Sequence, residues 1–235
     1  MQRWLVAWCC TLLYAGGVHA EGRYLSIIVR GNLTTGSQLF PTPASTDEVE
    51  RAFSEQIDNS FGVGAEIRYT LPETQVAIGL GTEYIRTTSS FQRPITPSSS
   101  RFVPVDDGYR VIPVELTGYF LIPVSGPTFS IYMGGGVGMY FGERVYSFAG
   151  VNAPSVSSGK GFGIHVLGGV SFALREWVAI QAEMKFRDLQ FESSNAFTVT
   201  EASYNGFTIP LSRQSFVSRV NTNGIVFQVG LAFSL

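Results

Sequence analysis

The chain has 235 residues, of which 45% are hydrophobic and 14% are charged, and its formal net charge is -2. Soluble domains usually carry about 25% charged residues, and disordered chains have few aromatic and β-branched residues, so both classes are disfavoured. The near-neutral charge balance provides no basic surface, which argues against nucleic acid as a partner.

The first twenty residues have the pattern of a cleaved secretory signal peptide. Arg3 precedes an apolar stretch at residues 4–18, and Val18-His19-Ala20 places small residues where signal peptidase cleaves. The apolar stretch is shorter than the roughly 20 residues that a membrane-spanning helix needs. A lipid anchor on a leader cysteine is the alternative, but the bulky Trp8 and Cys9 fit its cleavage site poorly.

Cleavage after residue 20 would leave one domain at residues 21–235. It would remove both cysteines, Cys9 and Cys10, and the basic residue Arg3, so the net charge would become -3 (15 basic against 18 acidic residues). We therefore expect an exported chain in which neither disulfides nor thiolate chemistry has a role.

The rest of the chain alternates between apolar and small or polar residues, as β-strands with two different faces do. At residues 129–142 the odd positions are mostly large and apolar, and the even positions hold Gly, Ser and Tyr. Pro113 predicts a bulge or an outer extension within the fourth strand. In chain order we predict eight strands at 23–33, 61–71, 76–87, 109–122, 129–142, 161–174, 178–186 and 225–235.

The connections between these strands alternate between long and short. We predict long outer loops near 34–60, 88–108, 149–159 and 189–224, and short turns at 72–75, 123–127 and 175–177. This alternation is typical of an up-and-down outer-membrane barrel. The last loop contains the hairpin signal Tyr204-Asn205-Gly206-Phe207, which predicts a β-ribbon or a mobile loop outside the barrel, or an inserted hairpin that would give ten strands.

The composition of the two strand faces indicates what each face meets. The faces opposite the apolar ones carry mainly Gly, Ala, Ser, Tyr and Gln, whereas the exposed face of a soluble sheet would carry many charges. An eight-stranded interior is just wide enough for side chains to fill, and closure removes the sheet edges that hydrocarbon cannot satisfy. We predict an all-β, eight-stranded antiparallel up-and-down transmembrane β-barrel with aromatic residues near both ends of the lipid-facing surface.

The last eight residues, 228–235, resemble the terminal β-signal of bacterial outer-membrane barrels. Gln228, Gly230, Phe233 and Leu235 occupy its polar, glycine, aromatic and terminal hydrophobic positions, although Leu235 replaces the more usual Phe. With the leader, strands and connections, the resemblance extends over the whole chain, to small barrels of the OmpA N-terminal, OmpX and OmpW kind.

This resemblance implies insertion by the barrel-assembly machinery and residence in the bacterial outer membrane, among its lipid and lipopolysaccharide. It does not imply one activity, because this fold hosts adhesion, structural, pore and enzyme roles.

Four acids and four bases are expected to point into the barrel. Unpaired charges would be costly there, so we predict a paired and hydrogen-bonded network. Interior packing is the favoured role of this network, and a narrow proton or ion path is the alternative. The residues are Arg30, Glu66, Arg68, Glu83, Glu115, Glu183, Lys185 and Arg187.

No catalytic, cofactor-binding or metal site is expected. His165 is the one histidine that remains after cleavage, and Ser171 lies six residues along the same strand, roughly 20 Å away. No Gly-x-Ser-x-Gly elbow or His-x-x-x-His pair occurs. The glycine cluster at 134–138 lacks the lysine and the helix of a phosphate loop.

We therefore predict a non-catalytic barrel with a structural or surface-interaction role, similar to adhesion, that binds an extracellular ligand through its loops. The alternatives are a small passive pore or conduit for ions or hydrophobic solutes and, with less support, an exported lipocalin-like carrier.

Overall fold

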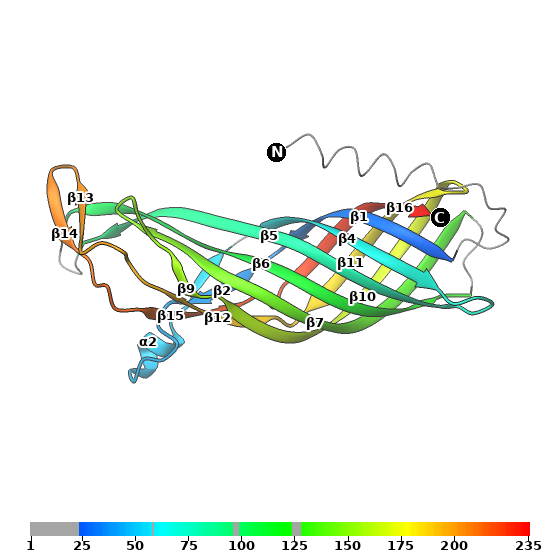
Figure 1. Ribbon diagram of the computed structural model, residues 1–235, viewed down its shortest axis with the longest axis horizontal. Coiled ribbons are helices and arrows are strands. Elements are labelled where there is room, and N and C mark those ends of the chain that lie inside the picture. Colours follow the sequence, from blue (N-terminus) through cyan, green and yellow to red (C-terminus); the bar gives the residue numbers. More distant parts are fainter. Residues whose placement is uncertain (1–23, 58, 96–98, 124–127) are drawn as a thin grey trace.

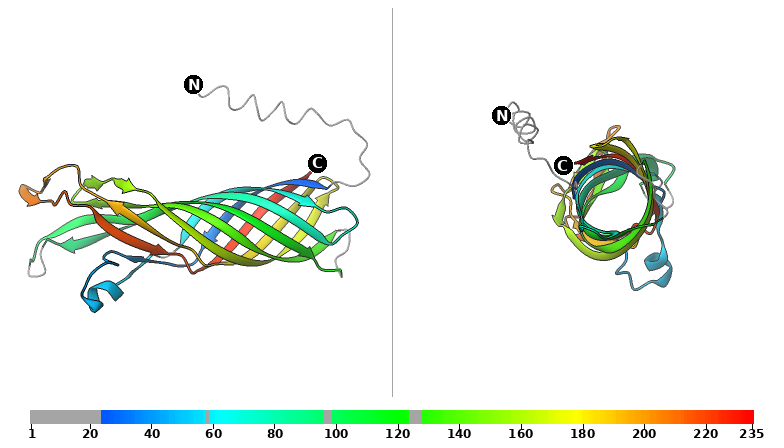
Figure 2. Two further views of the ribbon diagram at one scale, coloured as in Figure 1. Left: turned by 60° about the horizontal axis from the view of Figure 1, so that its bottom comes forward. Right: turned by 90° about the vertical axis from the view of Figure 1, so that its right-hand side faces the viewer.

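The computed structural model describes residues 24–57, 59–95, 99–123 and 128–235, and eight of its strands form a closed antiparallel barrel. Figure 1 shows the barrel from the side, and Figure 2 shows the same strands arranged as a ring when viewed along the axis. β16 pairs with β1, and β10 with β7, so the sheet has no open edge. The predicted fold class is confirmed. In order around the barrel the strands are β1 (Leu25–Thr34), β4 (Ser60–Thr70), β5 (Val76–Pro94), β6 (Phe102–Leu121), β7 (Phe129–Phe148), β10 (Gly159–Arg175), β11 (Val178–Arg187) and β16 (Ile225–Ser234).

Two predicted segments fall wholly or partly outside this description. The expected signal peptide at residues 1–20 lies outside the described residues, and so does most of the expected turn at 123–127.

The alternation of side chains in the sequence gives the barrel an apolar outer surface and an interior filled with side chains. On β7, Met133, Val137 and Met139 face outward, whereas Tyr132 and Tyr140 are buried in the interior. Aromatic residues mark both ends of this exposed apolar belt: Tyr69, Phe129, Phe172 and Trp177 at the short-turn end, and Phe61, Tyr84, Phe162 and Phe186 at the other. A soluble lipocalin-like carrier does not fit such a belt, because exposed apolar surface on this scale is unfavourable in water. Among the described residues, no helix has the length and hydropathy needed to span a bilayer.

Three strands continue well beyond the belt, where the sequence predicted loops. β5 reaches Pro94, β6 begins at Phe102 and β7 reaches Phe148, so most of the expected loop at 88–108 is a β-hairpin. Val103 and Val105 are fully buried in it. The outer faces of these strands meet water, where polar side chains are favourable. The segment is therefore rich in Ser and Thr, a composition that is also typical of loops.

A second sheet accounts for much of the other expected loops. Its strand order is β3-β2-β15-β12-β9. Each of these strands is next in the chain to one barrel strand, and the corresponding barrel strands lie in the same order, β4-β1-β16-β11-β10. Five barrel strands therefore resume beyond the belt after short interruptions, and the expected loops at 34–60, 149–159 and 189–224 contain strands. We call the part of the chain beyond the belt the extension (Figure 1). The strands of this sheet are β2 (Ser37–Phe40), β3 (Glu55–Ile57), β9 (Ser155–Ser157), β12 (Gln190–Asn195) and β15 (Phe216–Asn221).

Two smaller elements belong to the extension. The short helix α2 (Glu48–Ala52) begins after Asp47, whose side chain accepts a hydrogen bond from the backbone N–H of Val49 at 2.8 Å. It has no buried residue, and Figures 1 and 2 show it at the side of the tube. A further three-residue strand, β8 (Val151–Ala153), pairs with the end of β7.

The predicted turn at Asn205 and Gly206 joins β13 (Glu201–Tyr204) to β14 (Phe207–Pro210). Both turn residues have positive φ, at 49° and 79°, as the hairpin signal requires. The two strands form their own sheet outside the barrel, so the ribbon is correct and the ten-stranded alternative is wrong. Ala202 and Ile209 of this hairpin pack against Val103.

Pro113 does not create the predicted bulge. The pairs Thr82–Val114 and Ile85–Val111 keep the same register on either side of it. The pairing of β5 with β6 lapses only between these pairs, because Pro113 has no backbone N–H to donate.

Three glycines on β10 allow a second layer of backbone inside the mouth of the barrel. A Cβ atom at Gly159, Gly161 or Gly163 would lie 1.9, 2.2 or 2.0 Å from the carbonyl oxygen of Glu192, Gln190 or Asp188, respectively. Residues 188–192 therefore lie directly against the inner face of β10, which brings Leu189 and Phe191 into the interior.

We expect Gly163→Ala to destabilise the barrel by about 1–3 kcal/mol, because a methyl group would displace backbone that cannot move easily. Gly168→Ala is the matched control, since a Cβ atom at Gly168 meets nothing within 4 Å. The measurement is the midpoint of urea unfolding in detergent, followed by heat-modifiable gel mobility. Equal midpoints for the two variants would show that the close approach of residues 188–192 does not constrain the fold.

Candidate functional site

The eight predicted interior charges are all buried, and they lie on five of the eight barrel strands. Each is at most 8% exposed. They divide into two groups of two acids and two bases. β1 supplies Arg30, β4 supplies Glu66 and Arg68, β5 supplies Glu83, β6 supplies Glu115, and β11 supplies Glu183, Lys185 and Arg187.

The first group is a closed ring of four ion pairs, which we call ring 1. Arg30 contacts Glu66 through Nη2 at 2.7 Å and Glu183 through Nη1 at 2.9 Å. Arg68 contacts the same two carboxylates, Glu66 through Nε at 2.8 Å and Glu183 through Nη2 at 3.0 Å. Every charge in ring 1 therefore has two opposite neighbours, and the ring is neutral.

Two tyrosines complete ring 1. The Tyr119 hydroxyl donates to Glu66 Oε2 and the Tyr132 hydroxyl to Glu183 Oε1, both at 2.8 Å. The guanidinium of Arg68 lies 3.8 Å from the centroid of the Tyr119 ring, a cation–π contact. The sequence pattern at 129–142 put Tyr132 on the inner face, but it identified neither tyrosine as a partner of the charges.

The second group, ring 2, has the same closed pattern. Lys185 Nζ lies 3.1 Å from Glu83 and 2.7 Å from Glu115. Arg187 contacts Glu83 through Nη2 at 2.8 Å and Glu115 through Nε at 2.9 Å. Ring 2 is also neutral, because it holds two acids and two bases.

Amide and hydroxyl groups surround ring 2. Asn32 and Gln228 donate their side-chain N–H groups to Glu83 at 3.0 and 2.9 Å, and Tyr140 donates its hydroxyl to Glu115 at 3.1 Å. Glu83 thus accepts from four different side chains, which satisfies a buried carboxylate without any net charge in the interior.

His165 lies on the inner face of β10, near ring 2. Its Nε2 is 2.9 Å from Thr117 Oγ1, and its side chain is buried. In the part of the chain that the structure describes, no group of three or more His, Cys, Asp or Glu side chains is arranged to hold a metal ion.

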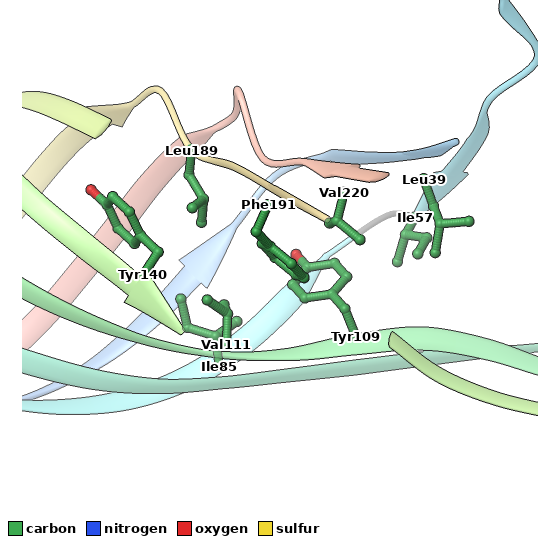
Figure 3. Packing of buried hydrophobic residues seen from close by; sticks show 9 residues of the cluster. All are labelled: Leu39, Ile57, Ile85, Tyr109, Val111, Tyr140, Leu189, Phe191 and Val220. Atoms are coloured by element: carbon green, nitrogen blue, oxygen red, sulfur yellow. The ribbon is translucent and has the colours of Figure 1, made fainter. Parts of the chain in front are cut away.

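An apolar cluster, which we call the cap, fills the mouth of the barrel on the extension side. Figure 3 shows its side chains pointing toward one another from different walls. The rings of Tyr109 and Phe191 meet edge to face, with centroids 6.3 Å apart. The Tyr109 hydroxyl lies 2.7 Å from Ser37 Oγ and 2.9 Å from Ser60 Oγ, so its polar end is satisfied inside the cap. The members are Leu39, Ile57, Ile85, Tyr109, Val111, Tyr140, Leu189, Phe191 and Val220.

Sequence reasoning missed the cap because most of its members lie in or beside segments predicted to be loops. It also missed the buried ion pair of Arg144 with Asp107 in the extension, where Arg144 Nε donates to Asp107 Oδ1 at 2.8 Å. The one sequence feature that could have predicted strands in these segments was the alternation of apolar and polar residues through 103–111 and 189–193.

The residues of the predicted β-signal lie on the strand that closes the barrel, or directly after it. Gly230 faces Arg30 on β1, where a Cβ atom would come within 2.4 Å of the Val29 carbonyl oxygen. Gln228 faces ring 2, Phe233 stacks on Trp177 at the outer surface, and the backbone N–H of Leu235 donates to the Leu25 carbonyl at 2.8 Å. Recognition of these residues by the assembly machinery stays a prediction.

We expect Glu83→Gln to lower the free energy of unfolding by about 3–5 kcal/mol, because it leaves Lys185 and Arg187 short of negative charge in a buried ring. The control is Glu192→Gln, which removes the exposed ion pair with Arg219 and should cost at most about 1 kcal/mol. Urea unfolding in detergent measures both. Similar losses for the two variants would contradict a stabilising role for ring 2.

Comparison with known proteins gives matches in structure only. No protein-family model matches the chain, and no curated protein matches it. The outer membrane protein OprG from Pseudomonas aeruginosa is similar with a TM-score of 0.52 and 13% identity, over 91% of this chain and 97% of that one.

Two further solved structures are less similar. The outer membrane protease OmpT from Escherichia coli has a TM-score of 0.47 and 7% identity, over 93% and 99% of the two chains. Ail, the attachment invasion locus protein of Yersinia pestis, has a TM-score of 0.44 and 14% identity, over 91% and 100%.

The likeness to OprG and the geometry of the barrel lead to the same conclusion. A closed barrel with an exposed apolar belt, aromatic ends and a polar interior is built to lie in a bilayer. The chain therefore has the fold of the small bacterial outer-membrane β-barrels, with its apolar belt in the outer membrane.

Proposed function

We propose that the protein is a closed, non-catalytic barrel that carries the extension above the membrane for contact with other surfaces or ligands. The observation that carries this proposal is the filled interior: ring 1, ring 2 and the cap occupy the barrel, while the strands continue outward. In this structural and surface-interaction role, the protein acts through the surface of the extension and not through the barrel interior.

The interior opposes the passage of ions in two ways. Each charge in the rings is held by two opposite charges, so no mobile charge is left to relay an ion. The cap then places apolar side chains such as Leu189 and Phe191 across the mouth, and an ion that entered it would lose hydration without gaining partners.

The far end of the extension exposes apolar side chains where water would be the only neighbour. Phe102 and Phe207 are exposed, and the guanidinium of Arg101 lies 3.8 Å from the centroid of the Phe207 ring. Exposed aromatic and arginine side chains are typical of protein contact surfaces. This end is where we place the surface-interaction role.

A small passive pore or conduit is the alternative, and one observation favours it. Asn32 Oδ1, Thr34 Oγ1, His165 Nδ1 and Gln228 Oε1 are buried without a hydrogen-bond partner among the described residues. Buried polar atoms of this kind are usually satisfied by water, which favours a hydrated path beside ring 2.

Conductance in planar bilayers separates the two roles. We expect no reproducible single-channel steps from the wild type, because the rings and the cap fill the interior. The triple variant Glu115→Ala, Leu189→Ala and Phe191→Ala should conduct, since it removes part of ring 2 and of the cap. Steps in the wild type that are enlarged by Glu115→Ala or Arg68→Ala would contradict the closed barrel and favour the pore.

Adhesion of intact cells tests the surface role. We expect cells that produce the wild type to bind surfaces coated with extracellular protein more strongly than cells without it. The double variant Phe102→Ser and Phe207→Ser should lose most of this difference, because it removes the exposed aromatic residues. Val49→Ser on α2 is the control for an exposed apolar residue elsewhere. Equal adhesion with and without the protein would contradict the proposal.

A further inference from the structure

Three basic side chains lie on the outer face of the barrel at one level. Arg86 of β5 stands opposite Arg110 of β6, and Arg110 stands opposite Glu143 of β7. Lys160 of β10 stands opposite Phe141, one outward position below Glu143. Arg86, Arg110 and Lys160 are exposed, and we call these three residues the basic row.

The basic row lies at the edge of the apolar belt. Directly below it, on β5, β6 and β10, the exposed side chains are Tyr84, Ile112 and Phe162, and the exposed Phe141 of β7 stands opposite Lys160. Aromatic residues in such a position mark the boundary between hydrocarbon and headgroups. The basic row is therefore at the height of the lipid headgroups on the extension side.

This concentration of positive charge is confined to one side of the barrel. β1, β4, β11 and β16 have no charged residue on their outward faces, because all their Arg, Lys and Glu residues point inward. Among the described barrel strands, only β5, β6 and β10 thus present positive charge to an anionic headgroup at this level.

The charges of the basic row are only partly neutralised within the protein. Arg110 Nε lies 2.5 Å from Glu143 Oε1, whereas Arg86 and Lys160 make no ion pair with any other described residue. Two like charges directly opposite each other on neighbouring strands are destabilising, so the Arg86–Arg110 pair favours an additional anion between them.

We infer that the basic row binds the phosphate groups of a phosphorylated glycolipid in the outer leaflet. Arginine offers paired N–H donors that match phosphate oxygens. The row crosses four adjacent strands and is about 14 Å wide at the usual strand spacing, which suits a headgroup with more than one phosphate. The acyl chains of such a lipid would lie on Tyr84, Ile112 and Phe141, and this second contact favours a lipid over free phosphate. The inference does not depend on whether the barrel conducts.

The test uses the folded full-length protein in detergent and measures lipid binding by native mass spectrometry. The probes are a diphosphorylated lipid A-type glycolipid, its dephosphorylated counterpart, and inorganic phosphate as a competitor. The test variant is Arg86→Gln with Arg110→Gln and Lys160→Gln. Arg213→Gln is the control for each single replacement, because it removes one positive charge from an exposed residue outside the row.

We expect the triple variant to bind the diphosphorylated glycolipid at least about tenfold more weakly than the wild type, since charge-assisted hydrogen bonds to phosphate are strong. Arg213→Gln should bind like the wild type, and the dephosphorylated lipid should bind weakly to all three proteins. Heat-modifiable mobility reports whether each variant is folded. If the triple variant does not fold, Arg86→Gln alone, which breaks no ion pair, should still weaken binding severalfold.

Three results would overturn the inference. Equal binding by the folded triple variant and the wild type would exclude the basic row as the site. Equal binding of the dephosphorylated and the diphosphorylated lipid to the wild type would exclude phosphate as the recognised group. Displacement of the glycolipid by millimolar inorganic phosphate would indicate a general anion site rather than a lipid site.

Discussion

The closure of eight buried charges into two neutral rings is the interaction on which the rest of the barrel depends. The outer face must be apolar because it meets lipid, so the charged and hydrogen-bonding side chains of the belt strands point inward. Each guanidinium, ammonium and carboxylate in that narrow space needs two opposite partners, and ring 1 and ring 2 provide them. Glycine makes room for the aromatic members around the rings: a Cβ atom at Gly169 would contact Tyr132, and one at Gly138 would contact Tyr140. The many glycines and the few charges of the chain thus have one cause.

The division between rings and cap also explains how the protein changes along its axis. Within the belt, charged side chains hold the strands together across the interior. Beyond the belt, water replaces lipid outside, and apolar residues such as Phe191 and Val220 move to the inside. The extension therefore has an ordinary apolar core, as a soluble β-structure does. The membrane part has the reverse arrangement, and residues 188–192 on the glycines of β10 form the transition between the two.

The sequence could predict whatever depends on local alternation. The strands of the belt, the inward position of all eight charges and the turn at Asn205-Gly206 follow from residue patterns within a few positions. It could not predict partners that depend on register between distant strands, such as Arg30 with Glu183 or Lys185 with Glu83. It also could not predict β2 or β12, which are short and polar and gain their stability from distant pairs such as Leu39–Val220 and Phe191–Val220. The long β5–β6 hairpin was missed because Ser- and Thr-rich strands resemble loops when water is their neighbour.

The strands that reach the extension do so in two different ways, and this has a mechanical consequence. β5 and β6 run without a break from the membrane to the far end, and β7 runs unbroken as far as Phe148, opposite Val105 of β6, whereas the other five strands are interrupted between the barrel and the second sheet. A pull on the far end would therefore be carried into the membrane mainly along the β5–β6 and β6–β7 ladders, whose many hydrogen bonds would resist it together in shear. The interrupted side would yield first, so the tube would bend toward a preferred direction under load while its anchored side stayed intact.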